Sequence, residues 1–227
     1  CNGGGNINTN NLKSDSSGTA RLGSNTLKDE NEDKIFNFVI TGSQIPTSVL
    51  TTNGTLLQSE SNAFRYTSND RIPKDIIHLR SNGDNVIMSG QSGNIYYTTY
   101  RLSKIIADNV NKNLALYGAT IGNSNMYAVG YNGNVFIKSS FNPESPNLGN
   151  WKNIPLNGST LYSIASNVRN VVTVGNSGTI WVSHDSGMHW KKVVVPNVTK
   201  NLYEVENING DFYVVGDFAT LLHSNNN

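Results

Sequence analysis

Few side chains in this sequence could perform nucleophilic, redox or metal chemistry, and they do not gather in a recognisable pattern. Cys1 is the only cysteine of the 227 residues, so no disulfide can form within the chain. The histidines show no metal-ligand spacing; they are His78, His184, His189 and His223. Glycine-rich phrases lead into strand-like segments rather than helices, which excludes a phosphate-binding loop. We therefore expect no catalytic residue, no metal and no cofactor.

One segment carries a specific pattern, Ser183-His-Asp-Ser-Gly-Met-His-Trp190. The Asp185 carboxylate can accept backbone N–H groups of a turn, Gly187 can adopt positive φ, and Trp190 can bury a large ring. The pattern resembles the Asp-box of BNR-type β-propellers. Together with the preceding residues from 174 onward, it resembles the propellers of the photosystem assembly factor type. The resemblance implies that Ser183, Asp185, Gly187 and Trp190 have a structural role.

A phrase of Gly, two residues and then Gly or a substitute recurs along the chain between apolar runs, with a weaker first copy at Thr51-Thr-Asn-Gly54. Its second position falls at residues 54, 93, 133, 178 and 219, which gives steps of 39, 40, 45 and 41. An apolar or aromatic residue lies 13 positions before the first position of each phrase, at Phe38, Ile77, Tyr117, Tyr162 and Tyr203. Agreement at two separate features indicates a true repeat.

Each repeat contains four short strand-like segments, which we call a, b, c and d in chain order. Four strands in about 40–45 residues are typical of a β-propeller blade. We expect an all-β propeller, residues 19–227, with blades near 34–74, 75–113, 114–157, 158–199 and 200–227. The last blade ends after strand c, so an N-terminal strand around residues 20–27 is expected to close the ring as its fourth strand. A truncated ring of six or seven blades and a β-sandwich are the alternatives.

The first 18 residues contain almost no apolar side chain and read as a flexible tether. A leading Cys1 followed by such a run resembles a mature bacterial lipoprotein, in which that cysteine carries the lipid. The resemblance implies a cell-envelope protein anchored in a membrane through its N-terminal lipid alone. Asn2 directly after the cysteine implies the outer membrane, with the periplasmic or surface side left open.

Composition narrows the class of partner. The formal net charge is +1, and only 15% of the residues are charged, so a nucleic-acid binder is not expected. The sequence has 36 Asn and 21 Gly, which suit the many turns of a propeller.

In a propeller the b–c turns and d–a loops share one face, which we expect to be the binding face. Its candidate residues are Tyr131, Asn132, Asp217, Phe218, Arg71 and Lys74. The main hypothesis is a non-enzymatic scaffold, monomeric alone, that binds another envelope protein through this face. The alternative is a lectin-like binder of glycans, since five-bladed propellers resemble the tachylectin-type sugar binders.

A sialidase-like glycosidase is the remote alternative. Residues 71–73 match the Arg-Ile-Pro motif of sialidases, which also resemble this chain in having Asp-boxes. Sialidases additionally need an arginine cluster and a tyrosine nucleophile paired with a glutamate. Glu204 is the only glutamate that we expect on an inner strand.

Overall fold

The fold is an all-β propeller built from antiparallel sheets. The computed structural model describes residues 73–99 and 104–224 in full, and elsewhere only the backbone of the strands between Thr9 and Ser68. Four successive sheets carry all four blade strands. They are β5–β8 (Ile35–Ile40, Thr47–Thr51, Leu56–Ser59, Arg65–Ser68), β9–β12 (Ile76–Asn82, Asn85–Gly90, Asn94–Thr99, Ile106–Asn109), β13–β16 (Leu116–Ile121, Met126–Gly130, Asn134–Lys138, Lys152–Pro155) and β17–β20 (Leu161–Asn167, Asn170–Gly175, Ile180–Ser183, Lys191–Val193).

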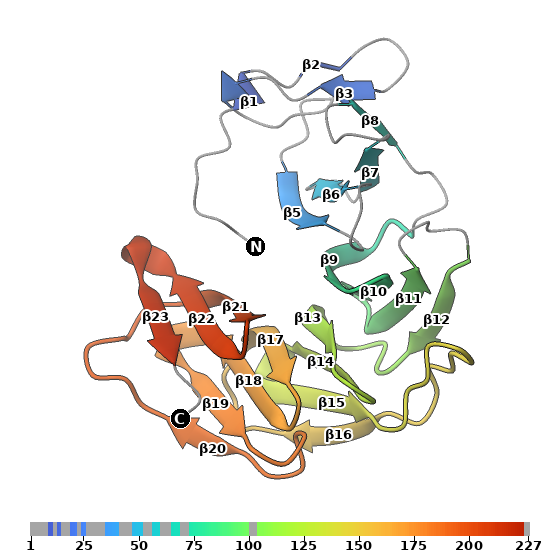
Figure 1. Cartoon of the computed structure of the whole chain (residues 1–227). Helices are drawn as coiled ribbons and strands as arrows, with labels where there is room; N and C mark the ends of the chain where they lie inside the picture. The colour runs from blue at the N-terminus through green and yellow to red at the C-terminus, as the bar shows by residue number, and fades with distance from the viewer. Residues whose placement is uncertain are drawn as a thin grey trace.

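A fifth sheet in this series has only three strands, β21 (Leu202–Ile208), β22 (Asp211–Gly216) and β23 (Leu221–Ser224). Single 3₁₀ turns join strands b and c in the last three sheets: η1 (Tyr131–Gly133), η2 (Asn176–Gly178) and η3 (Asp217–Ala219). The sheets stand around a common centre with their first strands innermost (Figure 1). Each inner strand lies beside the next, in the order β5, β9, β13, β17, β21.

The expected ring closure by an N-terminal strand is wrong. The strand β3 (Thr19–Arg21) pairs with β8 at the outer edge of the first sheet, and β2 (Lys13–Ser14) pairs with β3. The strands β1 (Thr9–Asn10) and β4 (Ser24–Asn25) pair with each other. The Thr-Ala-Arg sequence of β3 has no alternating apolar face that would select the groove beside β23, and β8 is the nearer edge along the chain.

The hydrophobic core lies between neighbouring sheets rather than at the centre of the ring. Trp151 packs against the cluster between the β9–β12 and β13–β16 sheets, beside the buried Tyr97. Trp190 packs in the same way between the β13–β16 and β17–β20 sheets, beside Tyr127 and Ile137. Each of these tryptophans directly precedes the fourth strand of its sheet, β16 or β20. The start of each of these two strands therefore contributes a core residue to the interface with the preceding sheet.

The b–c phrase needs glycine because the chain following strand d passes directly over it. A Cβ on Gly133 would lie 2.4 Å from the Leu156 carbonyl oxygen, and one on Gly178 would lie 2.1 Å from that of Val198. Both glycines also have positive φ, 71° at Gly133 and 72° at Gly178. The last phrase has Ala219 here, with φ of 56°, in a sheet where the described residues contain no fourth strand. The alanine is therefore tolerated sterically, although its backbone conformation is strained.

We expect Ala219→Gly to stabilise the protein by about 0.5–1 kcal/mol, because glycine adopts positive φ without steric cost. Gly178→Ala is the matched control and should destabilise the protein, since its Cβ would meet backbone. Urea unfolding of the two variants and the parent protein measures both effects. A less stable Ala219→Gly protein would contradict the strain argument.

Candidate functional site: the turn face and the central channel

The b–c turns and the starts of the inner strands form one end of the propeller, which we call the turn face. The amide of Tyr131 donates to the Ala115 carbonyl (3.1 Å), and the amide of Asp217 donates to that of Asn201 (2.9 Å). Both acceptors lie immediately before an inner strand. The turns and the mouth of the central channel therefore share one surface.

Three tyrosines form a row at this mouth, one on each of three adjacent inner strands. The rings of Tyr117 and Tyr162 meet edge to face with centroids 5.7 Å apart, and Tyr162 and Tyr203 lie 5.5 Å apart. Burial raises the pKa of the Tyr162 hydroxyl, and the nearby Tyr203, Tyr117 and Asp217 raise it further. The three tyrosines occupy the repeated position 13 residues before each phrase, so their shared place at the starts of the inner strands could be predicted from the sequence. Sequence reasoning used that position to set the repeat register and did not assign it to a site.

The structure places most of the sequence-predicted face residues on this surface. Tyr131 is 56% exposed and Phe218 is 84% exposed. Asn132 lies exposed beside Tyr131, and Asp217 precedes Phe218 in η3. Lys74 is exposed just before β9, whereas Arg71 lies outside the described residues.

Three further contacts involve the b–c turns and the residues at the start of β21. The Asn201 side chain accepts from the Ser177 amide (3.1 Å) and donates to the Tyr203 hydroxyl (3.2 Å). The Lys200 ammonium lies 5.5 Å from the centre of the Phe218 ring. The turns and the tyrosine row therefore place exposed aromatic side chains at one end of the propeller, with the Lys200 ammonium beside Phe218.

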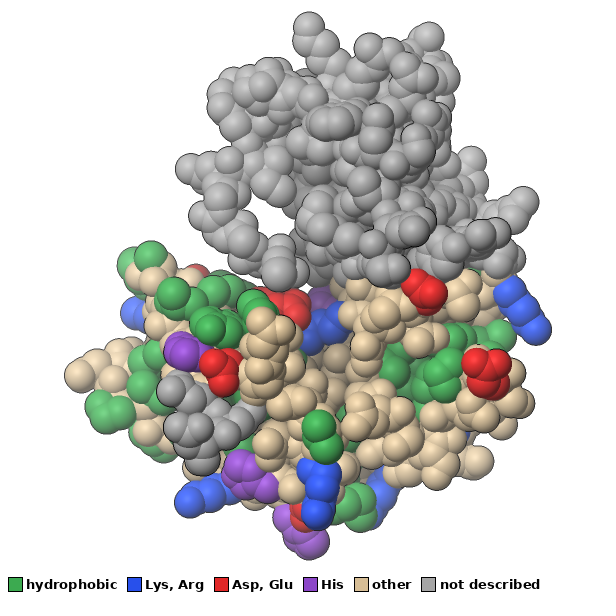
Figure 2. Space-filling model, viewed as in Figure 1, with side chains coloured by type: hydrophobic (Ala, Val, Ile, Leu, Met, Phe, Trp, Pro, Cys, Tyr) green, Lys and Arg blue, Asp and Glu red, His purple; other side chains and the backbone are tan. Residues whose placement is uncertain are grey.

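Below the mouth, a buried ion cluster crosses the central channel. Arg80 on β9 pairs with Glu204 on β21, and its guanidinium also donates to the carbonyls of Ile164 and Val205 (both 2.9 Å). Ser163 on β17 donates to Glu204 and accepts from the Val205 amide (3.1 Å). Figure 2 shows acidic, basic and histidine side chains together near the centre of the molecule.

Two other groups complete the cluster. Glu206 accepts from Arg80 at 3.2 Å, and it also lies on β21. The expectation that Glu204 is the only glutamate on an inner strand is therefore wrong. His78 places Nε2 3.8 Å from Glu204 and leaves Nδ1 buried without a hydrogen-bond partner.

Electrostatics assign the ion cluster a structural role. Burial alone would raise the pKa of Glu204, but the Arg80 charge, the nearby His78 and the bond from Ser163 outweigh it and hold the pKa at about 2. A carboxyl group that stays ionised at neutral pH cannot serve as a general acid there. Both Arg80 and Glu204 are also buried, at 8% exposure each, and their polar atoms bind one another.

The opposite end of the channel holds a polar hollow of about 160 Å³. It is lined by Arg80, Ser81, Asn82, Thr120, Ile121, Ala165, Ser166, Glu206 and Asn207. The buried Ser166 hydroxyl has no hydrogen-bond partner. In the fully described ranges, no group of three or more metal-binding side chains occurs.

The Ser183–Trp190 turn lies at that opposite end and joins β19 to β20. Asp185 accepts from the Ser183 hydroxyl and the His189 amide, both at 2.8 Å, and the Trp190 indole donates to the Gly187 carbonyl at 2.8 Å. The bonds from the His189 backbone and side chain hold the pKa of the Asp185 carboxyl well below its usual range. Every one of these partners lies within the turn, so its polar groups are used to build the turn.

Gly187 lets this turn approach the neighbouring sheet. Its φ is 86°, and a Cβ would lie 2.6 Å from Ile137 and 3.1 Å from Tyr127. The Tyr127 hydroxyl also donates to the Ser186 carbonyl at 3.2 Å. The turn therefore fixes the Trp190 ring between two sheets.

Comparison with known proteins supports the architecture only. No family model and no curated protein matches the sequence. Among solved structures, a chain in the crystal structure of a nidogen/laminin complex matches with a TM-score of 0.61 and 10% identity. The match covers 91% of this chain and 85% of that chain. At this identity the likeness shows a shared propeller fold.

We expect Glu204→Gln to cost about 3 kcal/mol of stability at pH 7, because it removes the buried carboxylate that pairs with the Arg80 charge. The folded-state pKa of Glu204 is depressed from 4.5 to about 2, so its stabilisation is complete above pH 4.5 and is lost as the pH falls towards 2. Urea unfolding across this range should therefore show a weaker acid dependence in Glu204→Gln. Glu144→Gln, at an exposed glutamate outside the ion cluster, is the control that keeps the parent profile. An unchanged acid profile in Glu204→Gln would refute the assignment.

Proposed function

We propose that this protein is a non-enzymatic scaffold of the bacterial cell envelope, anchored by a lipid on Cys1, that binds another envelope protein through its turn face. The observation that carries the proposal is the aromatic surface formed by Tyr131, Phe218 and the tyrosine row. Tyrosine is enriched among the residues that dominate binding energy at protein interfaces. The proposal places the anchor in the outer membrane.

The buried ion cluster supports a binding role over a catalytic one. The sialidase-like alternative needs a glutamate that can take the proton of a tyrosine, but the Glu204 carboxylate is bound by Arg80 and Ser163. The structural neighbour offers a further parallel, since its description is a complex of nidogen with laminin. A propeller in that complex belongs to a protein assembly.

A glycan is the second candidate ligand, because the polar hollow presents hydroxyl and amide groups with one unpaired hydroxyl, that of Ser166. Its volume of about 160 Å³ is small against the roughly 300–1,000 Å³ of typical small-molecule sites. The matching positions of the four fully described inner strands also differ: Arg80, Thr120, Ala165 and Glu206 occupy one level. Equivalent sugar sites in each blade are therefore not supported.

The double variant Tyr131→Ala, Phe218→Ala should weaken partner binding more than tenfold, since each aromatic anchor removed can cost about 2 kcal/mol. Crosslinking in cells followed by mass spectrometry identifies the partner, and titration of purified proteins measures affinity. Met188→Ala is the matched control, an exposed apolar residue in the turn at the opposite end. Unchanged affinity in a folded double variant would contradict the proposed face.

The anchor is tested separately in cells that express the gene with its native leader. Metabolic labelling with a clickable fatty acid should label the protein, and Cys1→Ser should abolish both the label and membrane association, because the lipid is the proposed anchor. Separation of inner and outer membranes then locates the protein. Membrane retention of an unlabelled Cys1→Ser protein would refute lipid anchoring.

A further inference from the structure

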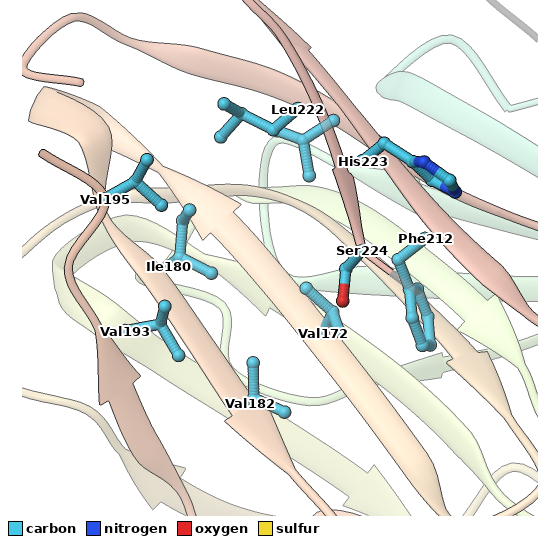
Figure 3. Close-up of a pocket in the computed structure, with 10 residues that line it drawn as sticks. Val172, Ile180, Val182, Val193, Val195, Phe212, Leu222, His223 and Ser224 are labelled. Atoms are coloured by element: carbon cyan, nitrogen blue, oxygen red, sulfur yellow. The ribbon is translucent and has the colours of Figure 1, made fainter. Parts of the chain in front are cut away.

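An open apolar groove lies between the β17–β20 sheet and the three-stranded β21–β23 sheet (Figure 3). Its volume is about 170 Å³. The lining residues are Val172, Ile180, Val182, Val193, Val195, Phe212, Val214, Leu222, His223 and Ser224. The side chains in Figure 3 come from both sheets, and Val172, Phe212 and Leu222 border the same opening.

The equivalent space between each earlier pair of fully described sheets is occupied by a tryptophan. Trp151 fills it between the β9–β12 and β13–β16 sheets, and Trp190 fills it between the β13–β16 and β17–β20 sheets. Each tryptophan belongs to the later sheet of its pair and stands immediately before that sheet's fourth strand. The described part of the last sheet has neither the fourth strand nor its tryptophan.

The repeat register shows which residues of the groove correspond to those around Trp190. The residues around Trp190 include Tyr127, Ile137 and Trp181. At the same positions of the next blade interface stand Val172, Val182 and Leu222, and all three line the groove. The groove is therefore the counterpart of the Trp190 site, lined by smaller side chains.

The edge of the sheet beside the groove is open as well. In the described strand pairings β23 bonds to β22 and to no strand on its other side. Leu221 on this edge strand is 66% exposed. An unpaired strand edge is a template for the main chain of an added strand.

We propose that β23 and this groove bind an extended segment of a partner polypeptide, which adds as the fourth strand and inserts a tryptophan into the groove. The chain supplies the pattern twice, as Trp151-Lys-Asn-Ile154 and Trp190-Lys-Lys-Val193. The occupant therefore carries a tryptophan followed three residues later by a β-branched residue. A cavity of about 150 Å³ accommodates benzene, so the groove is large enough for an aromatic ring.

The printed residues favour a separate polypeptide over one of their own segments or a second copy of them. The three tryptophans of the chain are Trp151, Trp181 and Trp190, and all three already pack within the described blades. The N-terminal strand β3 is paired with β8. Ala219 further limits the added strand. At the equivalent Gly133 and Gly178, the chain that follows the d strand lies where a Cβ would be, so a full-length segment would meet the Ala219 methyl group. The docked segment is therefore shorter than a full d strand with its following loop.

The probe is a fluorescein-labelled peptide, Gly-Met-His-Trp-Lys-Lys-Val-Val-Val-Pro, which copies residues 187–196 of this chain. Fluorescence anisotropy with the full protein should show saturable binding at one site. Replacement of the peptide tryptophan by alanine should weaken binding at least about tenfold. Hydrogen exchange should show peptide-dependent protection of the β23 amides, which identifies strand addition.

Two protein variants localise the site. Leu222→Lys places a charge in the groove and should weaken binding at least about tenfold. Leu221→Lys is the matched control, because its exposed side chain is adjacent in sequence but does not line the groove. Unfolding curves of both variants establish that they fold.

Several results would overturn the proposal. They are an absence of saturable binding up to about 1 mM, equal affinity for the alanine peptide, and equal loss of binding in the two leucine variants. Self-association abolished by Leu222→Lys would assign the groove to a second copy instead. Strong protection of the β23 amides in the isolated monomer would assign it to a segment of this chain. The turn-face variant Tyr131→Ala, Phe218→Ala should bind the peptide with the affinity of the parent protein. Failure of the proposed function and failure of this proposal are therefore distinguishable.

Discussion

The ion pair between Arg80 and Glu204 is the constraint on which the centre of this propeller depends. It joins β9 to β21, and bonds from the same guanidinium to Ile164 and Val205 include β17. No strand pairing links the last sheet to the first among the described strands, so curvature must be fixed at the axis. A buried guanidinium with its donors satisfied by a carboxylate and two carbonyls resists displacement, because any inner strand that moves leaves a buried charge unpaired.

The same constraint favours the rim of the channel as the place of the proposed function. The channel centre is filled by the Arg80–Glu204 ion pair and its hydrogen-bond partners. The inner strands also approach closely: a Cβ on Gly118 would lie 2.8 Å from the Tyr162 carbonyl oxygen. Little adaptable space remains there for a substrate. The side chains not used by the fold are instead the aromatics at the strand starts and b–c turns, which are rigid, partly exposed and already positioned. Recognition by such a surface requires little ordering of the protein on binding.

The local features of the fold were predictable from the sequence because they arise from local sterics. The phrase glycines marked the b–c turns since backbone passes within contact distance of their missing Cβ atoms, and the spacing of those phrases gave the blade repeat. The exposure of Tyr131 and Phe218 followed from their place in the turns. Arg80 and Glu204 could not be paired from the sequence, because their contact spans 124 residues and neither occupies a repeated residue type. The pairing of β3 with β8 was missed for a related reason: two short polar strands carry no apolar pattern to specify register.

Ala219 shows that a departure from a repeat can be as informative as the repeat. Glycine stands at this position in each described sheet that has a fourth strand, and alanine stands there in the sheet that lacks one. The tryptophan that precedes each of the last two fourth strands is missing from the same sheet. In the described residues no chain lies over β23, and this accounts both for the lost steric requirement at Ala219 and for the missing residue that would fill the interface. The open groove therefore follows from the sequence of the last described blade. Its lining residues occupy the same repeat positions as those that surround the d strand and the Trp190 indole at the preceding blade interface.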